Sequence, residues 1–82
     1  MRIKAKVVGM GARKSGTSKK GREYDFTPFH LVYLDKNTEG FAAAVTNVDQ
    51  SILDAIPMPH INDEIETFCH FYNGSMIVDG IL

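Results

Sequence analysis

The chain has a single cysteine, no tryptophan and no long apolar run among its 82 residues. Because Cys69 has no second cysteine to pair with, an intrachain disulfide is excluded, which argues against a disulfide-rich secreted mini-protein and favours a reducing compartment. No apolar run approaches the roughly 18 residues that cross a bilayer, and no signal peptide is visible at the N-terminus. We therefore expect a cytoplasmic protein with no membrane partner, folded as a single domain over residues 1–82.

Residues that bind metals or carry out covalent catalysis are few and poorly spaced. The three histidines and the cysteine show no zinc-type spacing. Cys69 and His70 are neighbours on an expected strand, so their side chains point to opposite faces, which disfavours a nucleophile–base pair. Residues 11–18 resemble a phosphate-binding loop in glycine spacing, but Thr17 stands where that motif requires lysine and no helix follows. We expect no metal site, no cofactor and no enzymatic activity.

Basic residues are almost absent beyond Arg22. Residues 1–22 hold eight of the nine lysines and arginines and no acid, whereas residues 23–82 hold Lys36 and all ten acids. The two parts carry formal charges of +8 and −9, which the net charge of −1 conceals. A basic segment of this kind favours a polyanionic partner. Pairing of opposite surfaces between two copies of the chain is the alternative interpretation.

Alternation of apolar and polar residues, the period of two that is typical of strands, dominates the sequence. Asp49 is a plausible N-cap for a short helix over residues 50–56. Asn73-Gly74 predicts a type I′ hairpin that places Phe71, which we expect in the core, opposite Met76 and Tyr72 opposite Ser75. The expected strands cover residues 2–7, 24–34, 41–48, 65–72 and 76–82.

Five strands, with one short helix between the third and the fourth, are the element order of a small OB-like barrel. Residues 9–21 contain four glycines, so we expect an exposed loop or a long hairpin there. Pro28 has no N–H to donate to a ladder, which predicts a sheet edge or a bulge. The predicted fold class is all-β, a five-stranded OB-like barrel with one short helix and a protruding basic β-hairpin wing. A single core of this size is marginally stable, so we expect a homodimer.

The candidate binding site combines the basic wing with aromatic residues that follow it. Proteins bind single-stranded nucleic acid with a positively charged track and aromatic side chains on which bases stack. Tyr24 and Phe26 share one face of a strand, and Tyr72 beside the hairpin turn is either a dimer contact or a third stacking group. The alternative interpretation is a solvated wing with Tyr24 and Phe26 in the core. The residues expected to contact nucleic acid are Arg13, Lys14, Ser18, Lys19, Lys20, Arg22, Tyr24, Phe26 and Tyr72.

The run from Arg13 to Phe26 resembles the DNA-binding wing of the gene V-type single-stranded DNA-binding proteins of filamentous phages. The shared pattern is basic-x-Gly-x-Ser-basic-x-Gly-basic-x-Tyr-x-apolar, and it begins at Lys14. The resemblance implies an OB-like dimer that coats single-stranded phage DNA cooperatively and with little sequence preference during DNA replication in a bacterial cytoplasm. It gives Lys14, Lys19 and Arg22 the basic roles, Tyr24 the stacking role and Phe26 the neighbouring apolar contact.

One departure from the family concerns the end of the chain. Family members carry further basic residues there, whereas this chain ends Asp79-Gly80-Ile81-Leu82. We expect Lys4 and Lys6, on the outer face of the first strand, to compensate. Two other functions stay open from the sequence: an OB-like protein-interaction module whose wing docks on an acidic partner, and a single-stranded RNA-binding regulator.

Overall fold

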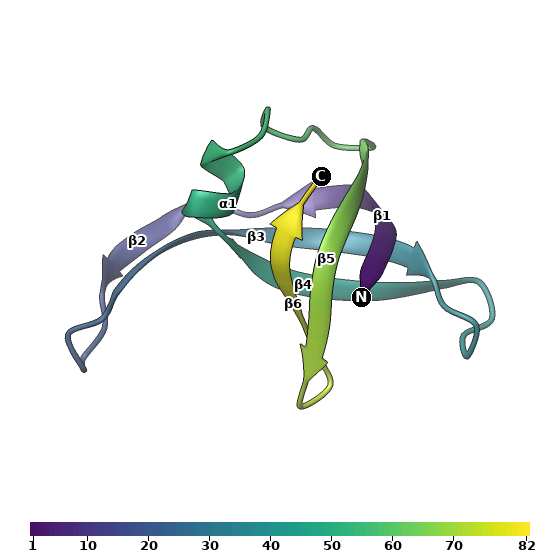
Figure 1. Cartoon of the computed structure of the whole chain (residues 1–82), viewed down its shortest axis with the longest axis horizontal. Coiled ribbons are helices and arrows are strands. Elements are labelled where there is room, and N and C mark those ends of the chain that lie inside the picture. The colour runs from purple at the N-terminus through teal and green to yellow at the C-terminus, as the bar shows by residue number, and fades with distance from the viewer.

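The computed structural model describes all 82 residues and shows a mostly β protein with one short helix (Figure 1). Strands hold 61% of the residues and form one open antiparallel sheet, which confirms the all-β class. The helix follows the third long strand, as expected. The elements are β1 (Arg2–Met10), β2 (Lys14–Thr17), β3 (Glu23–Leu34), β4 (Phe41–Asp49), α1 (Gln50–Asp54), β5 (Glu64–Tyr72) and β6 (Ser75–Ile81).

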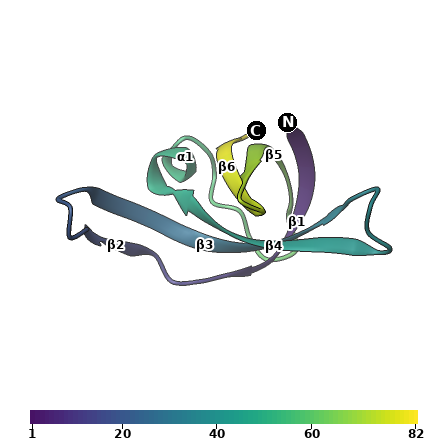
Figure 2. The same ribbon diagram turned by 90° about the horizontal axis from the view of Figure 1, so that it is seen from below.

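The structure has six strands, one more than the sequence predicts, because residues 14–17 of the wing pair with β3. The sheet order is β2-β3-β1-β5-β6, and β4 pairs with the other edge of β3. The twelve-residue strand β3 is therefore the central strand. Along one edge it pairs first with β2 and then with β1. Its two hairpins, with β2 and with β4, extend in opposite directions, while α1, β5 and β6 lie to one side (Figure 2).

Pro28 marks the place where β3 changes partners. Its carbonyl accepts a hydrogen bond of 2.8 Å from the N–H of Gly11, between the end of the β1 ladder and the start of the β2 ladder. The backbone N–H and C=O of a residue in an antiparallel strand point to the same side. The N–H that Pro28 lacks would therefore have pointed into this break between the two ladders, where no strand needs it. The register shift lies on β1, between Val7 and Gly9, and Pro28 pairs with Asn47 of β4 without interruption.

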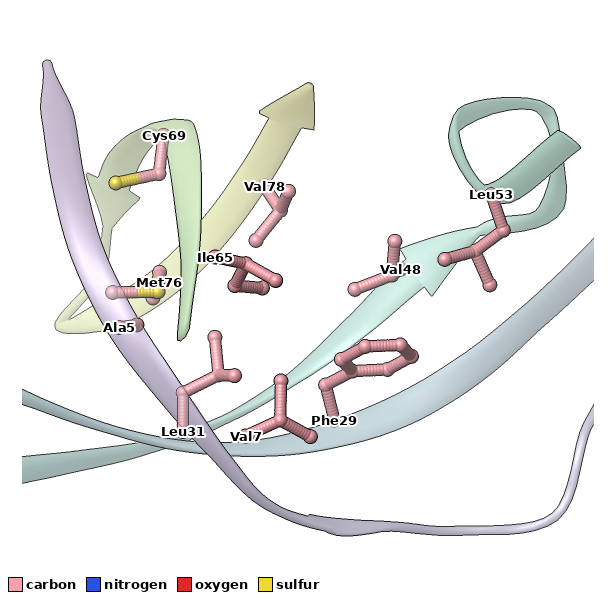
Figure 3. Close-up of a cluster of buried hydrophobic side chains, with 10 residues drawn as sticks. All are labelled: Ala5, Val7, Phe29, Leu31, Val48, Leu53, Ile65, Cys69, Met76 and Val78. Atoms are coloured by element: carbon pink, nitrogen blue, oxygen red, sulfur yellow. The ribbon is translucent and has the colours of Figure 1, made fainter. Parts of the chain in front are cut away.

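The core lies between β1, β3, β4, β5 and β6, with α1 over one end (Figure 3). Leu53 reaches from α1 towards Val48 and Phe29, which closes this end of the core. β4 and β6 contribute Val48 and Val78 to the same cluster, yet no ladder joins these two strands. The ten buried core residues are Ala5, Val7, Phe29, Leu31, Val48, Leu53, Ile65, Cys69, Met76 and Val78.

Helix α1 begins as predicted but ends two residues early. Asp49 is the N-cap, and its carboxylate accepts bonds from the N–H of Ser51 at 2.9 Å and from the hydroxyl of Ser51 at 2.7 Å. Ala55 and Ile56, predicted to be helical, form a closing turn instead. Pro57 explains this early end, because proline disfavours the helical conformation in the residue before it. With five residues, α1 is neither long nor apolar enough to cross a membrane.

The hairpin between β5 and β6 has the predicted type I′ turn. Asn73 and Gly74 both have positive φ, at 50° and 78°, and Phe71 faces Met76 across the ladder. The prediction that Phe71 belongs to the core is wrong, since 43% of this residue is exposed. Phe71 shares the inward-facing side of β5 with Cys69 but lies near the tip of the hairpin, where its ladder partner Met76 is buried and Phe71 itself stays open to solvent.

Candidate nucleic-acid interface

The outer face of β3 carries the aromatic residues that follow the wing. Thr27, Phe29 and Leu31 are buried, so the residues between them lie on the opposite, outer face. Tyr24 is 43% exposed and Phe26 is half-buried, and neither belongs to the core cluster. The interpretation that places Tyr24 and Phe26 in the core is therefore wrong.

Three glycines lie beside the rings of this face, two on the neighbouring strands and one in the connection between β1 and β2. Gly16 pairs with Tyr24, and a Cβ atom at Gly16 would lie 2.8 Å from the phenol oxygen of Tyr24. A Cβ at Gly9 would lie 3.4 Å from Cβ and Cγ of its partner His30. A Cβ at Gly11 would lie 3.1 Å from Cγ of Pro28. The rings of Tyr24, Pro28 and His30 therefore lie close to glycine backbone, where a side chain would otherwise stand.

We name this row of four rings, Tyr24, Phe26, Pro28 and His30, the ring platform. The centroids of Tyr24 and Phe26 are 5.8 Å apart and their planes are tilted by 38°. Phe26 pairs with Lys14 of β2 on one side and with Asp49 of β4 on the other. The ring platform thus offers successive π and ring surfaces beside a lysine, the arrangement on which single-stranded bases stack.

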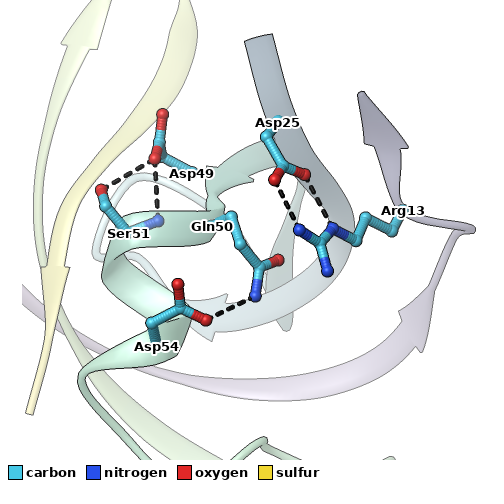
Figure 4. Close-up of polar contacts among 6 residues, drawn as sticks. All are labelled: Arg13, Asp25, Asp49, Gln50, Ser51 and Asp54. Carbon is cyan, nitrogen blue, oxygen red and sulfur yellow. Dashed lines mark hydrogen bonds and ion pairs between the residues drawn. The ribbon is translucent and has the colours of Figure 1, made fainter. Parts of the chain in front are cut away.

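Arg13 is held on the opposite side of the wing. Its Nε donates to Oδ1 of Asp25 at 2.7 Å and its Nη2 to Oδ2 at 2.5 Å, beside α1 (Figure 4). The hydrogen bond from Arg13 keeps the pKa of Asp25 below its ordinary value of 3.8. Asp25 alternates with Tyr24 and Phe26 along β3, so the pair faces away from the ring platform. The structure therefore separates Arg13 from the other predicted contacts and gives it a partner.

The remaining basic residues of the predicted site lie in the wing, and hydrogen bonds of Ser18 stabilise the turn at its tip. The N–H of Ser18 donates to the carbonyl of Arg22 at 2.7 Å, and the N–H of Arg22 donates to the hydroxyl of Ser18 at 3.1 Å. Ser18 thus has a structural role in the turn that presents Lys19 and Lys20. The basic residues of the wing that make no ion pair are Lys14, Lys19, Lys20 and Arg22.

Tyr72 lies apart from the ring platform within one chain. It is 65% exposed at the tip of the β5–β6 hairpin, which projects from the middle of the molecule, apart from the wing at the left in Figure 1. The structure therefore does not bring Tyr72 together with Tyr24 and Phe26. A shared site between these residues requires a second copy of the chain or a ligand that wraps around the molecule.

The lysines of β1 have acidic neighbours. Lys4 pairs with Glu66 and Lys6 with Glu64 across the β1–β5 ladder. Glu66 is engaged by Arg2, with Nη2 2.6 Å from Oε1. Charge opposite Lys4 and Lys6 therefore reduces the positive potential that the sequence predicts for this strand.

Sequence reasoning missed that Pro28 and His30 continue the row of Tyr24 and Phe26, and it missed the close approach of these rings to glycines. The signal was present, because the period of two that links Tyr24 to Phe26 continues to His30. No group of three or more His, Cys, Asp or Glu side chains is arranged to hold a metal ion. Comparison of the chain with protein-family models, with curated proteins and with solved structures finds no match.

Proposed function

We propose that this chain is a single-stranded DNA-binding protein that coats phage or mobile-element DNA with little sequence preference. The observation that carries the proposal is the ring platform, with Tyr24 and His30 exposed and Phe26 and Pro28 half-buried, beside a wing whose lysines have no acidic partner. The pattern from Lys14 to Phe26 supports the same function through its resemblance to gene V-type proteins. Such a protein acts in the cytoplasm of a bacterial host.

The strand order supports an OB-like barrel. With the short β2 counted as part of the first connection, the strands pair in the order β4-β3-β1-β5-β6, and β4 and β6 face each other at the open seam. OB folds bind oligonucleotides on the face of their second and third strands and with two neighbouring loops. Here these parts are β3 and β4, the wing, and the Asn73-Gly74 turn.

The binding mechanism follows from the charges and the rings. Lys14, Lys19, Lys20 and Arg22 neutralise phosphates and release counterions, while bases stack on Tyr24 and Phe26. Four such contacts on a single strand give a slope of log K against log salt of roughly −3. Each stacked base contributes about 1–3 kcal/mol, whatever its identity, because every base has a π-face. This division of labour explains binding without sequence preference.

The partners in this proposal are single-stranded DNA and a second copy of the chain. A two-fold dimer binds two strands at once, and contacts between neighbouring dimers give a cooperative filament. Single-stranded RNA fits the same ring platform, since only a contact to the 2′-hydroxyl separates the two nucleic acids.

Fluorescence anisotropy with labelled oligo-dT at several salt concentrations tests the proposal. We expect binding that weakens as salt rises and that duplex DNA competes for poorly, with oligo-U as the RNA comparison. Tyr24→Ala should weaken binding about fivefold or more without lowering the melting temperature, whereas Tyr24→Phe, which keeps the ring, should bind like the parent. Absence of binding at low salt would overturn the proposal and favour the protein-interaction module.

A further inference from the structure

A hollow lies at the end of β3 opposite the wing. It measures about 460 Å³, and both β1 lysines line it together with residues of β3 and β4. Lys4 and Lys6 are exposed and alternate with the inward-facing Ile3, Ala5 and Val7, so they stand on the outer face of β1. Lys6 pairs with Val32, which shares the outer face of β3 with His30 of the ring platform.

The apolar residues of this hollow are unusually open to solvent. Leu34 is 77% exposed and Phe41 is 66% exposed, and the two face each other across the β3–β4 ladder. Neither belongs to the core or packs against it. An exposed aromatic ring beside two lysines without ion pairs repeats the chemistry of the wing at the other end of the same strand face.

We propose that Lys4, Lys6, Leu34 and Phe41 form a second nucleotide subsite, in which Phe41 contacts a base and the two lysines contact the phosphates beside it. This inference rests on the proposed function and extends it. Glu64 also lines the hollow. Arg2 lines it too, but Arg2 forms an ion pair with Glu66, the residue opposite Lys4. The remaining charges, Lys4 and Lys6 against Glu64, leave the subsite net positive by one, so it contributes less phosphate affinity than the wing and depends more on the aromatic contact.

The second subsite determines how long a stretch of DNA the chain can bind along β3. Tyr24 and Leu34 are ten residues apart on β3, which is about 33 Å at the rise of an extended strand. A stacked strand advances about 3.4 Å per nucleotide, so the full track holds at most about ten nucleotides. The ring platform alone, from Tyr24 to His30, spans about 20 Å and holds at most about six. Affinity should therefore still increase between oligonucleotides of six and twelve nucleotides.

The test compares dT6 with dT12 in variants of the full chain. Lys6→Gln and Phe41→Ala should each weaken dT12 binding, about fivefold for Phe41→Ala, and leave dT6 binding unchanged. Lys36→Gln is the matched charge control, because Lys36 is exposed in the β3–β4 turn and does not line this hollow. Both sites of substitution are exposed, and a thermal melt confirms that the variants fold.

A direct readout follows from the absence of tryptophan in the chain. In the Phe41→Trp variant, dT12 should quench the indole fluorescence, whereas Leu82→Trp, at a position that is 62% exposed and outside the hollow, should report no change. Equal affinity for dT6 and dT12, with no quenching at position 41, would overturn the second subsite and leave the proposed function intact. Failure of both oligonucleotides to bind would overturn the proposed function and the subsite with it.

Discussion

At the scale of single residues, the positions without side chains decide where the rings lie. Tyr24 and His30 each have a glycine as their ladder partner, and Pro28 lies against Gly11 in the connection between β1 and β2. A ring that covers bare backbone shields the ladder beneath it and keeps its other face free. These glycines therefore shape the proposed binding surface, and we expect their substitution to weaken binding before it lowers stability.

Gly16→Ala isolates this effect. The new methyl group would lie 2.8 Å from the phenol oxygen and 3.1 Å from Cζ of Tyr24, so the ring must move away. Gly16 and Tyr24 are both exposed, so we expect weaker oligo-dT binding with an unchanged melting temperature. Gly80→Ala is the matched control, because its methyl group would meet Phe68 at an ordinary distance of 3.7 Å. Anisotropy and thermal melts give the two readouts, and a Gly16→Ala variant with parental affinity would contradict the role of the ring.

At the scale of elements, the sequence predicted the turn and the helix cap, which depend on neighbouring residues, but not the short strand β2, which depends on pairing with β3. Asn73-Gly74 determined the type I′ turn and the β5–β6 register from Tyr72 back to Cys69, since few other sequences accept two successive positive φ angles; beyond Cys69 the register shifts by one residue. The Asp49 cap was predictable because its partner Ser51 is two residues away. Strand β2 was not, because its residues are exposed on every side and only pairing with β3 defines them. The alternation in the sequence showed that Tyr24 and Phe26 share one face of a strand. It could not show whether that face is buried, because a core face and a solvent face have the same period of two.

The α1 cap predicts a pH dependence of stability. Hydrogen bonds from the backbone and then the side chain of Ser51 hold the pKa of Asp49 below its ordinary value of 3.8. A depressed carboxyl pKa in the folded chain stabilises it above pH 3.8, and this stabilisation is lost as the pH falls through the folded-state pKa. Asp49→Asn keeps a capping side chain but removes the titration. Its melting temperature should approach that of the parent as the pH is lowered from 7 to 2.5. A constant difference across this range would contradict the charged cap.

At the scale of the whole molecule, the chain exposes more surface than a compact protein of its mass. Its accessible surface is 5786 Å², whereas about 4,900 Å² is typical of a compact monomer of this mass. Its radius of gyration is 13.0 Å, against about 11.7 Å for a compact chain of this length. The two hairpins of β3, extending in opposite directions, account for the elongated shape of 41 × 29 × 20 Å. The surplus of about 900 Å² is close to what one partner buries in a standard interface.

This surplus leads to a prediction about assembly. Because a core of ten buried residues is small, we expect part of the stability to come from a second copy of the chain. Dissociation then accompanies unfolding, so the melting temperature should rise with protein concentration. Scanning calorimetry over a hundredfold range of concentration measures this rise, and sedimentation equilibrium on the same samples gives the mass. Adding dT12 tests whether DNA and the second copy of the chain use different faces. If they do, dT12 should raise the melting temperature at every protein concentration. A melting temperature independent of concentration, with a mass of 9.1 kDa, would show that the chain is a monomer and that its open surface serves the nucleic acid alone.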